Sequence, residues 1–251
     1  MAMKLPAQLS LLPAPIDSLS LFLDFDGTLV PLADHPDAIE VPEGLPELLE
    51  SCSQRLGGRQ VLISGRTLAD LGRHLDVTNL SLCGSHGLEQ RMVGREERLA
   101  TEDGDLAAML AELKRYQAAT PGLEVERKRF GAALHFRRAP ELADAAAKFG
   151  GELAARHGLS VKKGKMVVEL VPPGYDKGMA VKAIMQDDVF ANSMPLYIGD
   201  DVTDEDGFRA ARELGGMAVI VGDRESGSAQ HRLDGPRAVH ALIKAIVEAP
   251  R

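Results

Sequence analysis

The stretch "SLSLFLDFDGTLV", residues 18–30, combines two features that set the architecture of this chain. Its first half is an almost unbroken apolar run, which is typical of a strand buried on both faces of a parallel sheet. The run ends in two carboxylates, Asp24 and Asp26, followed by Gly27 and Thr28, which favour a turn. Because a carboxylate in apolar surroundings is costly without a partner, this pair needs a cation, hydrogen-bond donors or both.

Similar apolar runs recur along the chain and alternate with helical patterns. The predicted strands are Leu19–Phe25, Gln60–Ile63, Leu80–Gly84, Pro195–Gly199 and Met217–Gly222. The predicted helices are Glu43–Leu56, Thr67–Leu75, Lys177–Gln186, Glu205–Leu214 and Arg237–Ala249. Strands that lack polar alternation and are separated by helices predict an α/β fold, with a Rossmann-like, doubly wound parallel sheet covered on both faces.

The middle of the chain, residues 104–175, has a different pattern. Its expected elements are a helix (Leu106–Ala119), two strands (Leu123–Arg129 and Ala132–Arg138), a second helix (Glu141–His157) and two more strands (Leu159–Lys163 and Met166–Val171). Gly164 and Lys165 are expected at a hairpin turn between the last two strands. The order α-β-β-α-β-β predicts an inserted α+β domain at 104–175, within a core formed by 1–103 and 176–251.

Charge is distributed unevenly between these two parts. The whole chain has a net charge of −8, which argues against nucleic acid as a partner. Residues 104–175 contain 12 Lys and Arg against 8 Asp and Glu, a net of +4, so the remainder carries −12. An acidic core and a basic insert suit an anionic ligand, with metal ions offsetting the charge of the core. The alternative is surface charge without a function.

Cysteine content and the N-terminal segment indicate the compartment. Cys52 and Cys83 are the only cysteines, and neither has a neighbour at a spacing typical of metal ligands. This favours two reduced thiols. The N-terminal apolar stretch is interrupted by Pro6, Pro13 and Pro15, so it makes a poor signal peptide, and no run is long enough to span a bilayer. We expect a cytoplasmic monomer with no membrane partner.

The carboxylate pair is expected at a ligand site, because open parallel sheets bind ligands at the carboxyl ends of their strands. Two close carboxylates raise one pKa unless both bind a cation. A carboxylate beside a metal can act as a nucleophile while its neighbour transfers protons. The alternative for Asp24 and Asp26 is a structural strand end followed by an Asx-type turn.

Two further stretches add groups that can bind a phosphate. In "VLISGR" (61–66), the hydroxyl of Ser64 and the backbone N–H groups lie at a strand–helix junction, where they could cradle a phosphate or cap the helix. In "GYDKGMAVKAI" (174–184), Asp176 is expected to cap a helix that begins with Lys177. Lys177 could neutralise a phosphate oxygen or be solvated.

A second apolar strand ends in acidic residues in "PLYIGDDVTDEDGF" (195–208). Thr203 with Asp206 fits a capping box for the next helix, and acids in that first turn favour the helix dipole. Asp200 ends the strand and needs another explanation. Together with Asp24 and Asp26 it offers hard oxygen ligands for an octahedral Mg²⁺.

These four stretches, in this order, resemble the four motifs of the haloacid-dehalogenase-like phosphatases. The segments "LISGR", "GSHGLEQR", "ALHFRRAP", "GKMVVELVPPGYDKG" and "YIGDDVTDEDGF" resemble the trehalose-6-phosphate phosphatase family over nearly the whole chain. The resemblance implies an Mg²⁺-dependent enzyme that hydrolyses trehalose 6-phosphate to trehalose and phosphate, the last step of trehalose biosynthesis. The inserted domain would be the cap that covers the site and determines the substrate.

The resemblance also implies roles for individual core residues. Asp24 would attack phosphorus and become an aspartyl-phosphate. Asp26 would protonate the leaving sugar oxygen and then activate water, and its backbone carbonyl would bind Mg²⁺. Ser64 and Lys177 would hold the transferring phosphoryl oxygens.

Further roles concern the metal and the sugar. Asp200 would complete the Mg²⁺ site, with Asp201 or Asp204 as partners behind it or as ligands through water. The implied substrate-binding residues are Arg66, Glu126, Lys128, Arg137, Lys165 and Glu169. A solvated strand face is the alternative for Glu126 and Lys128. His86 and His135 are lesser candidates, and the basic residues Arg127, Arg129 and Arg138 have no assigned role.

Three other functions compete with this interpretation. A related capped phosphatase could act on sucrose phosphate or a glycosyl-glycerate phosphate with the same chemistry. A phospho-acceptor signalling domain also uses acidic residues, a hydroxyl and a lysine, but it needs no insert, and Asp26 would shorten the life of its phosphorylated state. A catalytically silent binding protein is disfavoured by the full set of motif residues.

Overall fold

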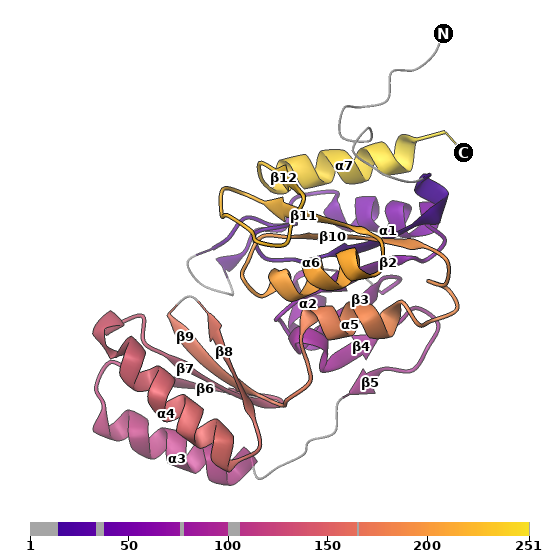
Figure 1. Cartoon of the computed structure of the whole chain (residues 1–251). Coiled ribbons are helices and arrows are strands. Elements are labelled where there is room, and N and C mark those ends of the chain that lie inside the picture. The colour runs from indigo at the N-terminus through magenta and orange to yellow at the C-terminus, as the bar shows by residue number, and fades with distance from the viewer. Residues whose placement is uncertain (1–14, 34–37, 76–77, 100–105, 165, 251) are drawn as a thin grey trace. The chain divides into compact units, whose positions relative to one another are not determined.

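The chain folds into two compact units with separate hydrophobic cores (Figure 1). The computed structural model describes residues 15–33, 38–75, 78–99, 106–164 and 166–250. The first unit comprises Met1–Leu99 and Asp176–Arg251, and the second comprises Ala100–Tyr175. The first unit is therefore formed by two stretches of chain that are far apart in the sequence.

The first unit contains an eight-stranded sheet in the order β12-β11-β10-β1-β2-β3-β4-β5. Its strands are β1 (Leu19–Leu23), β2 (Gln60–Ile63), β3 (Ser81–Gly84), β4 (Glu89–Arg91), β5 (Arg98–Leu99), β10 (Met194–Gly199), β11 (Met217–Val221) and β12 (His231–Leu233). The strands from β12 to β3 run parallel, and β4 and β5 add an antiparallel edge. The predicted parallel α/β sheet is confirmed.

Helices cover both faces of this sheet (Figure 1). They are α1 (Leu45–Arg55), α2 (Leu68–His74), α5 (Lys177–Ile184), α6 (Asp204–Glu213) and α7 (Pro236–Glu248). Residues of α1, α2 and α7 share one buried cluster, and residues of α5 and α6 share the other. Along β1, Leu21 and Leu23 enter the first cluster while Phe22 enters the second, because neighbouring side chains point to opposite faces. Burial on both faces explains the apolar run.

The end of β1 differs from the prediction. The strand ends at Leu23, two residues earlier than expected, because the chain turns immediately afterwards. In this turn the N–H of Leu29 donates to the carbonyl of Phe25 at 2.9 Å, and the N–H of Gly27 donates to the carbonyl of Val30 at 2.8 Å. Gly27 has φ +82°, which favours glycine. The two carboxylates therefore lie in a turn at the carboxyl edge of the sheet.

Three short strands, β4, β5 and β12, are absent from the sequence-based prediction. They contain three, two and three residues, and β4 consists of polar residues only, Glu89-Gln-Arg91. The prediction relied on apolar runs, which such strands lack. The helices were located correctly, with ends that differ by at most two residues.

The second unit has the predicted order α-β-β-α-β-β. Its elements are α3 (Leu106–Ala119), β6 (Glu124–Lys128), β7 (Gly131–His135), α4 (Ala143–Arg156), β8 (Ser160–Gly164) and β9 (Val167–Val171). The strands form an antiparallel sheet in the order β6-β7-β9-β8, with both helices on one face (Figure 1). Leu134 and Leu170 contribute to the core beneath the helices. The predicted turn is shifted, since Gly164 pairs with Val167 as the last residue of β8.

Within the described ranges, every helix is too short or too polar to cross a bilayer.

Candidate active site

The centre of the site is a buried lysine between two buried carboxylates. The Nζ of Lys177 donates to Asp24 Oδ1 and to Asp204 Oδ1, each at 2.6 Å. Lys177 is the first residue of α5, which is capped as predicted by the side chain of Asp176, an acceptor for the N–H of Met179 at 2.7 Å. Asp24 follows β1, and Asp204 begins α6. Three separate elements thus converge on one charged group.

Asp204 also organises the acidic end of β10. Its Oδ2 accepts hydrogen bonds from the N–H groups of Asp200 (3.1 Å) and Asp201 (2.9 Å), and its Oδ1 accepts one from the hydroxyl of Tyr197 at 2.8 Å. The predicted capping box is wrong. Thr203 has helical backbone angles and makes no capping hydrogen bond with any residue that the structure describes. Asp204, which needed no function as a helix-start acid, is instead fully buried behind the strand end.

The carboxylates of this cluster repel one another and have lost solvent. Burial raises the pKa of Asp24 well above its usual value; Lys177 opposes the shift, and Asp204 and Asp200 add to it. Burial also raises the pKa of Asp200 to about 6, with a further contribution from Asp204. For Lys177, burial alone would lower the pKa, but Asp204 and Asp24 raise it, so the ammonium is charged. The single positive charge of Lys177 does not balance the negative charges of three carboxylates. A bound divalent cation would balance the rest.

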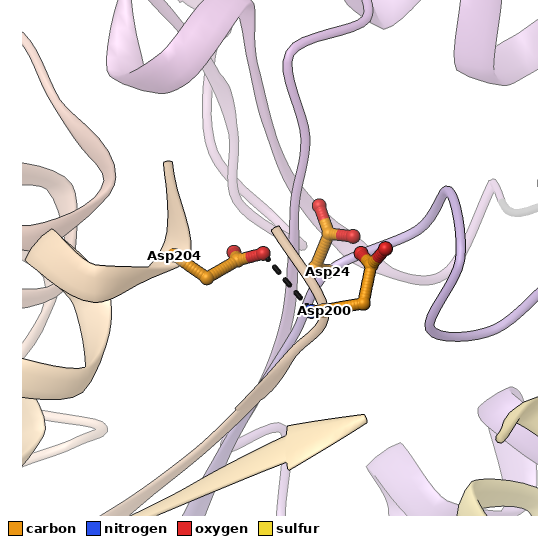
Figure 2. Close-up of side chains that lie close together, drawn as sticks. All are labelled: Asp24, Asp200 and Asp204. Carbon is orange, nitrogen blue, oxygen red and sulfur yellow. Dashed lines mark hydrogen bonds between the residues drawn. The ribbon is translucent and has the colours of Figure 1, made fainter. Parts of the chain in front are cut away.

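The donor set fits a hard divalent cation. One oxygen from each of Asp24, Asp200 and Asp204 lies within 4.8 Å of the others. Figure 2 shows the carboxylates of Asp24 and Asp200 side by side, with that of Asp204 directed at the backbone of Asp200. Carboxylate oxygens are the ligands that Mg²⁺ prefers. Because Asp204 already accepts four hydrogen bonds, Asp24 and Asp200 are the better placed ligands.

Gly27 explains how Asp200 can lie against the turn after β1. A Cβ at position 27 would be 2.1 Å from Asp200 Oδ2, so only glycine leaves room for this carboxylate. The hydroxyl of Thr28 also approaches Asp200 Oδ1, at 3.4 Å. Gly27 therefore serves two purposes, since it supplies a left-handed turn and a place for the carboxylate from β10.

Asp26 is separate from the carboxylate cluster and pairs with Arg66. The guanidinium donates to both oxygens of Asp26, from Nε at 2.7 Å and from Nη2 at 2.8 Å. Its Nη1 donates to Asp70 Oδ2 at 2.7 Å, and the ring of Phe25 lies 5.8 Å from the guanidinium carbon. Burial alone would raise the pKa of Asp70, but hydrogen bonds from Arg66 and Arg73 lower it. Arg66 thus connects the turn after β1 with α2.

Ser64 lies at the carboxyl end of β2, beside β1, and is buried. Its Oγ accepts a hydrogen bond from the N–H of Arg66 at 3.1 Å. The carbonyl of Ser64 accepts one from the N–H of His86 at 3.0 Å, and the His86 ring lies 2.8 Å from where a Cβ on Gly65 would be. Ser85 and His86 have positive φ values of 49° and 56°, so a tight turn after β3 supports the Ser64–Arg66 loop.

The second unit holds most of the residues expected to bind sugar. Glu126 on β6 and Glu169 on β9 both pair in register with Ala133 on β7, so they lie on the same sheet face, away from the helices. The Nζ of Lys128 donates to Glu169 Oε1 at 2.7 Å. His135 Nε2 lies 2.8 Å from Glu126 Oε2.

Four further arginines of this unit lie at its surface. Arg137 and Arg138 follow β7 and are exposed, as are Arg127 and Arg129 on and after β6. Lys165 lies outside the described residues. The structure therefore brings Glu126, Lys128, His135 and Glu169 together on one face.

Sequence reasoning missed several residues that shape the site. Tyr197 and Asp70 had no assigned role, although each contacts a predicted site residue. Glu89 is buried on β4, and its Oε2 accepts a hydrogen bond from the N–H of Leu68 at 2.6 Å. A signal was present for Glu89, because "GSHGLEQR" was one of the family-like segments. Tyr197 lies within an apolar run and gave none.

The fold and the site together define the class of protein. Carboxylates follow the two central parallel strands, β1 and β10, and a lysine from α5 contacts the one after β1, Asp24. The second unit interrupts this core between Leu99 and Asp176. The chain has the fold of the haloacid-dehalogenase-like hydrolases, which a solved structure from Bacteroides thetaiotaomicron shares at a TM-score of 0.66 and 18% identity.

Comparisons with known proteins give the family. The family model described as trehalose-phosphatase matches residues 22–236. A probable trehalose-phosphate phosphatase of Sinorhizobium fredii is 37% identical over 222 residues, covering 85% of this chain and 82% of the relative. The trehalose-6-phosphate phosphatase of Escherichia coli is 34% identical over 230 residues, covering 91% and 86%. The C-terminal domain of the C. albicans trehalose-6-phosphate phosphatase superposes with a TM-score of 0.79 at 27% identity, covering 98% of each chain. The chain belongs to the trehalose-phosphatase family, whose members are phosphoric monoester hydrolases.

Proposed function

We propose that this protein is an Mg²⁺-dependent phosphatase that hydrolyses trehalose 6-phosphate to trehalose and phosphate through an aspartyl-phosphate on Asp24. The observation that carries the proposal is the environment of Asp24. Its carboxylate is buried at a strand end, contacts the ammonium of Lys177 at 2.6 Å and lies beside Asp200. A carboxylate held in this way can attack phosphorus while the charge of the phosphoryl group is neutralised.

In the first step, an oxygen of Asp24 attacks phosphorus and the bond from phosphorus to the sugar oxygen breaks. Asp26 gives a proton to the leaving oxygen, which departs as the hydroxyl of trehalose. Lys177 and Ser64 hold phosphoryl oxygens during transfer, an electrostatic contribution that dominates this class of reaction. Lys177 is well suited to this role because two carboxylates fix its position.

In the second step, Asp26 takes a proton from a water molecule, which attacks the phosphorus of the aspartyl-phosphate. The bond between phosphorus and Asp24 then breaks, and phosphate and a free carboxylate result. Splitting one displacement into two lowers each barrier, and a positioned acid/base contributes about 10²–10⁴-fold.

Mg²⁺, when bound, would supply positive charge that offsets the repulsion between these carboxylates and the phosphoryl group. The residues to hold it are Asp24, Asp200 and the backbone carbonyl of Asp26. Asp204, at the start of α6, supports the site from behind, because its carboxylate accepts hydrogen bonds from the N–H groups of Asp200 and Asp201.

Arg66 links catalysis to substrate binding. Both oxygens of Asp26 accept hydrogen bonds from Arg66, so this pair must separate before Asp26 can transfer a proton. An incoming phosphoryl oxygen replaces Asp26 as the partner of Nε and Nη2, while Asp70 keeps hold of Nη1 at 2.7 Å. Substrate binding would thus release the acid/base group.

The sugar is recognised by the polar sheet face of the second unit. Glu126 and Glu169 flank Ala133, and carboxylates accept hydrogen bonds from sugar hydroxyls. Lys128, paired with Glu169, adds donors, as does Arg137. A site built to bind hydroxyls rejects ligands that lack them.

The test is phosphate release from trehalose 6-phosphate, sucrose 6-phosphate, glucose 6-phosphate and an aryl phosphate, each with Mg²⁺ or with EDTA. We expect trehalose 6-phosphate to be preferred and EDTA to abolish turnover. Equal turnover of glucose 6-phosphate would contradict the substrate, and full activity in EDTA would contradict the metal. A phosphorylated chain that persists for minutes would favour signalling.

A further inference from the structure

The loop after β11 passes beside the acidic end of β10. The two strands are parallel neighbours, and Gly199 pairs in register with Ile220. Asp200 therefore leaves the sheet next to the loop that begins with Gly222, whose φ is +78°. Arg224 lies in this loop, which none of the recognised motifs includes.

Arg224 reaches back to the backbone of the acidic strand end. Its Nε donates to the carbonyl of Asp200 at 3.1 Å, and its Nη2 donates to the carbonyl of Asp201 at 3.0 Å. Nη2 also donates to Glu205 Oε1 at 2.8 Å. One guanidinium thus binds two consecutive carbonyl groups and the second residue of α6.

Asp200 and Asp201 are also held from the opposite side, by Asp204. Its Oδ2 accepts hydrogen bonds from their N–H groups at 3.1 and 2.9 Å, respectively. Asp200 is therefore fixed at both its N–H and its carbonyl group. Fixing both groups sets the direction of its Cα–Cβ bond and hence the place of its carboxylate. Asp204 and Glu205 are adjacent in α6. Asp204 accepts the N–H groups of Asp200 and Asp201, and Glu205 accepts a hydrogen bond from Arg224, which binds their carbonyl groups.

Arg224 is itself held in place by its own loop. Its Nη1 donates to the carbonyl of Glu225 at 2.8 Å. The Oγ of Ser226 accepts the N–H groups of Ser228 (3.1 Å) and Ala229 (2.8 Å), and Arg212 donates to the carbonyl of Ser228 at 3.1 Å. An arginine fixed in this way can orient what it binds, because little freedom remains to be lost.

We infer that Arg224 is a positioning residue that sets the orientation of Asp200 for binding the divalent cation. The inference rests on the proposed function, since it takes Asp200 as a ligand. Mg²⁺ demands near-ideal octahedral geometry, so a small rotation of one carboxylate weakens binding. Residues behind the ligands of a metal site typically change its affinity by about 10–100-fold when mutated.

The experiment compares Arg224→Met with Arg212→Met. The control removes an arginine that binds the same loop at the carbonyl of Ser228 but, within the part of the chain that the structure describes, donates to neither Asp200 nor Asp201. For each protein, the melting temperature is followed against Mg²⁺ concentration without substrate, and the Mg²⁺ concentration for half-maximal phosphate release is measured. We expect about a 10–100-fold rise in the half-saturating Mg²⁺ for Arg224→Met and less than about a twofold change for Arg212→Met.

Arg224→Lys provides a second variant if Arg224→Met does not fold. Lysine keeps the charge but cannot bind two carbonyls with the same planar fork, so Mg²⁺ binding should weaken in this variant also. Equal Mg²⁺ responses of the Arg224 and Arg212 variants would overturn the inference, even if both melt at a lower temperature in EDTA. A wild-type protein that neither responds to Mg²⁺ nor releases phosphate would overturn the proposed function and the inference with it.

Discussion

At the scale of single residues, the site depends on charges that the protein itself does not balance. Lys177 lies between Asp24 and Asp204, and Asp200 adds a third carboxylate nearby. Burial raises the pKa of Asp24 and of Asp200, which means that the fold makes their ionised forms costly. A divalent cation would remove this cost, so the same residues link stability to metal binding.

Asp24→Asn is expected to abolish phosphate release, by at least about 10³-fold, because an amide oxygen is a poor nucleophile toward phosphorus. The amide keeps the volume of the side chain and can still accept a hydrogen bond from Lys177, so the fold should persist. Turnover and thermal unfolding are measured in parallel, with the exposed Asp188→Asn as the control. Substantial residual turnover would exclude Asp24 as the nucleophile.

Asp200→Asn is expected to stabilise the metal-free protein above pH 6. The pKa of Asp200 is about 6 in the fold and close to 3.8 when unfolded, so between these values the folded state binds more protons. The contribution of this group to stability therefore falls as pH rises from about 4 to 6, and stays lost above 6. Asparagine at this position carries no charge, so the variant does not lose this stability at high pH.

The measurement is the melting temperature in EDTA from pH 4 to pH 8 for Asp200→Asn and wild type. Their difference should be greatest at pH 7–8 and shrink toward pH 4. Addition of Mg²⁺ should raise the melting temperature of the wild type and leave the variant nearly unchanged. A variant that melts below the wild type at pH 8 in EDTA would contradict the electrostatic argument.

Gly27→Ala is expected to lower Mg²⁺ affinity as well as stability. The new Cβ would meet Asp200 Oδ2 at 2.1 Å, so this carboxylate would have to move. Gly44→Ala is a matched control, because Gly44 has a similar φ of +77° but nothing within 4 Å of its Cβ position. Both should lose about 1–2 kcal/mol from the left-handed backbone alone. Only Gly27→Ala should change the Mg²⁺ titration, and equal titrations would be evidence against the contact.

At the scale of secondary-structure elements, the candidate site residues lie just after strands and at helix starts. β1, β2 and β10 are followed directly by Asp24, Ser64 and Asp200, while α5 and α6 begin with Lys177 and Asp204. The buried strands were predictable because an apolar run without alternation has few other interpretations. The role of Asp204 at the start of α6 was not predictable, because "TDED" fits a capping box equally well. Only the fold shows that the Asp204 side chain points inward.

The two interpretations of the α6 start predict different stabilities. Thr203→Ala should change the free energy of unfolding by less than about 0.5 kcal/mol, whereas loss of a capping residue typically costs about 1 kcal/mol. Asp204→Ala should cost about 3–5 kcal/mol, because it takes away the acceptor of the Tyr197 hydroxyl and of two N–H groups and one of the two carboxylates that pair with Lys177. Urea unfolding of both variants measures these losses. A larger loss for Thr203→Ala than for Asp204→Ala would support the capping-box interpretation.

Some site residues could not be found from local pattern at all. Arg224 lies in a loop of mixed composition, and its contacts depend on β10 and β11 being neighbours, which only the sheet order reveals. Arg66 was expected to bind substrate, yet its partners Asp26 and Asp70 lie 40 residues before it and one helical turn after it. Long-range pairs of this kind depend on topology, which a single strand or helix pattern does not contain.

At the scale of the whole molecule, chemistry and specificity are expected to be separable. The carboxylate cluster, Lys177 and Arg66 belong to the first unit, and the face with Glu126 and Glu169 belongs to the second. A change in the second unit should therefore alter the preference for a disaccharide more than the reaction itself.

Glu169→Gln is expected to raise KM for trehalose 6-phosphate about 10-fold or more, as loss of a hydrogen bond to a charged group costs about 1.5–3 kcal/mol. KM and kcat for an aryl phosphate should change little, because this substrate has no sugar to bind. Glu152→Gln, an exposed change on α4, serves as the control. Equal effects on both substrates would remove Glu169 from the sugar site.

The pairing of β1 with β10 has a consequence for biosynthesis. Leu19 lies opposite Met194, so β1, which precedes Asp24, emerges from the ribosome long before its neighbour β10. At about 5–20 residues per second, the delay is roughly 10–35 s. The intervening unit is contiguous and can fold during that time, while an apolar edge of the nascent core waits uncovered. Chaperones that shield such edges would therefore act on this chain mainly during the interval before β10 has been translated.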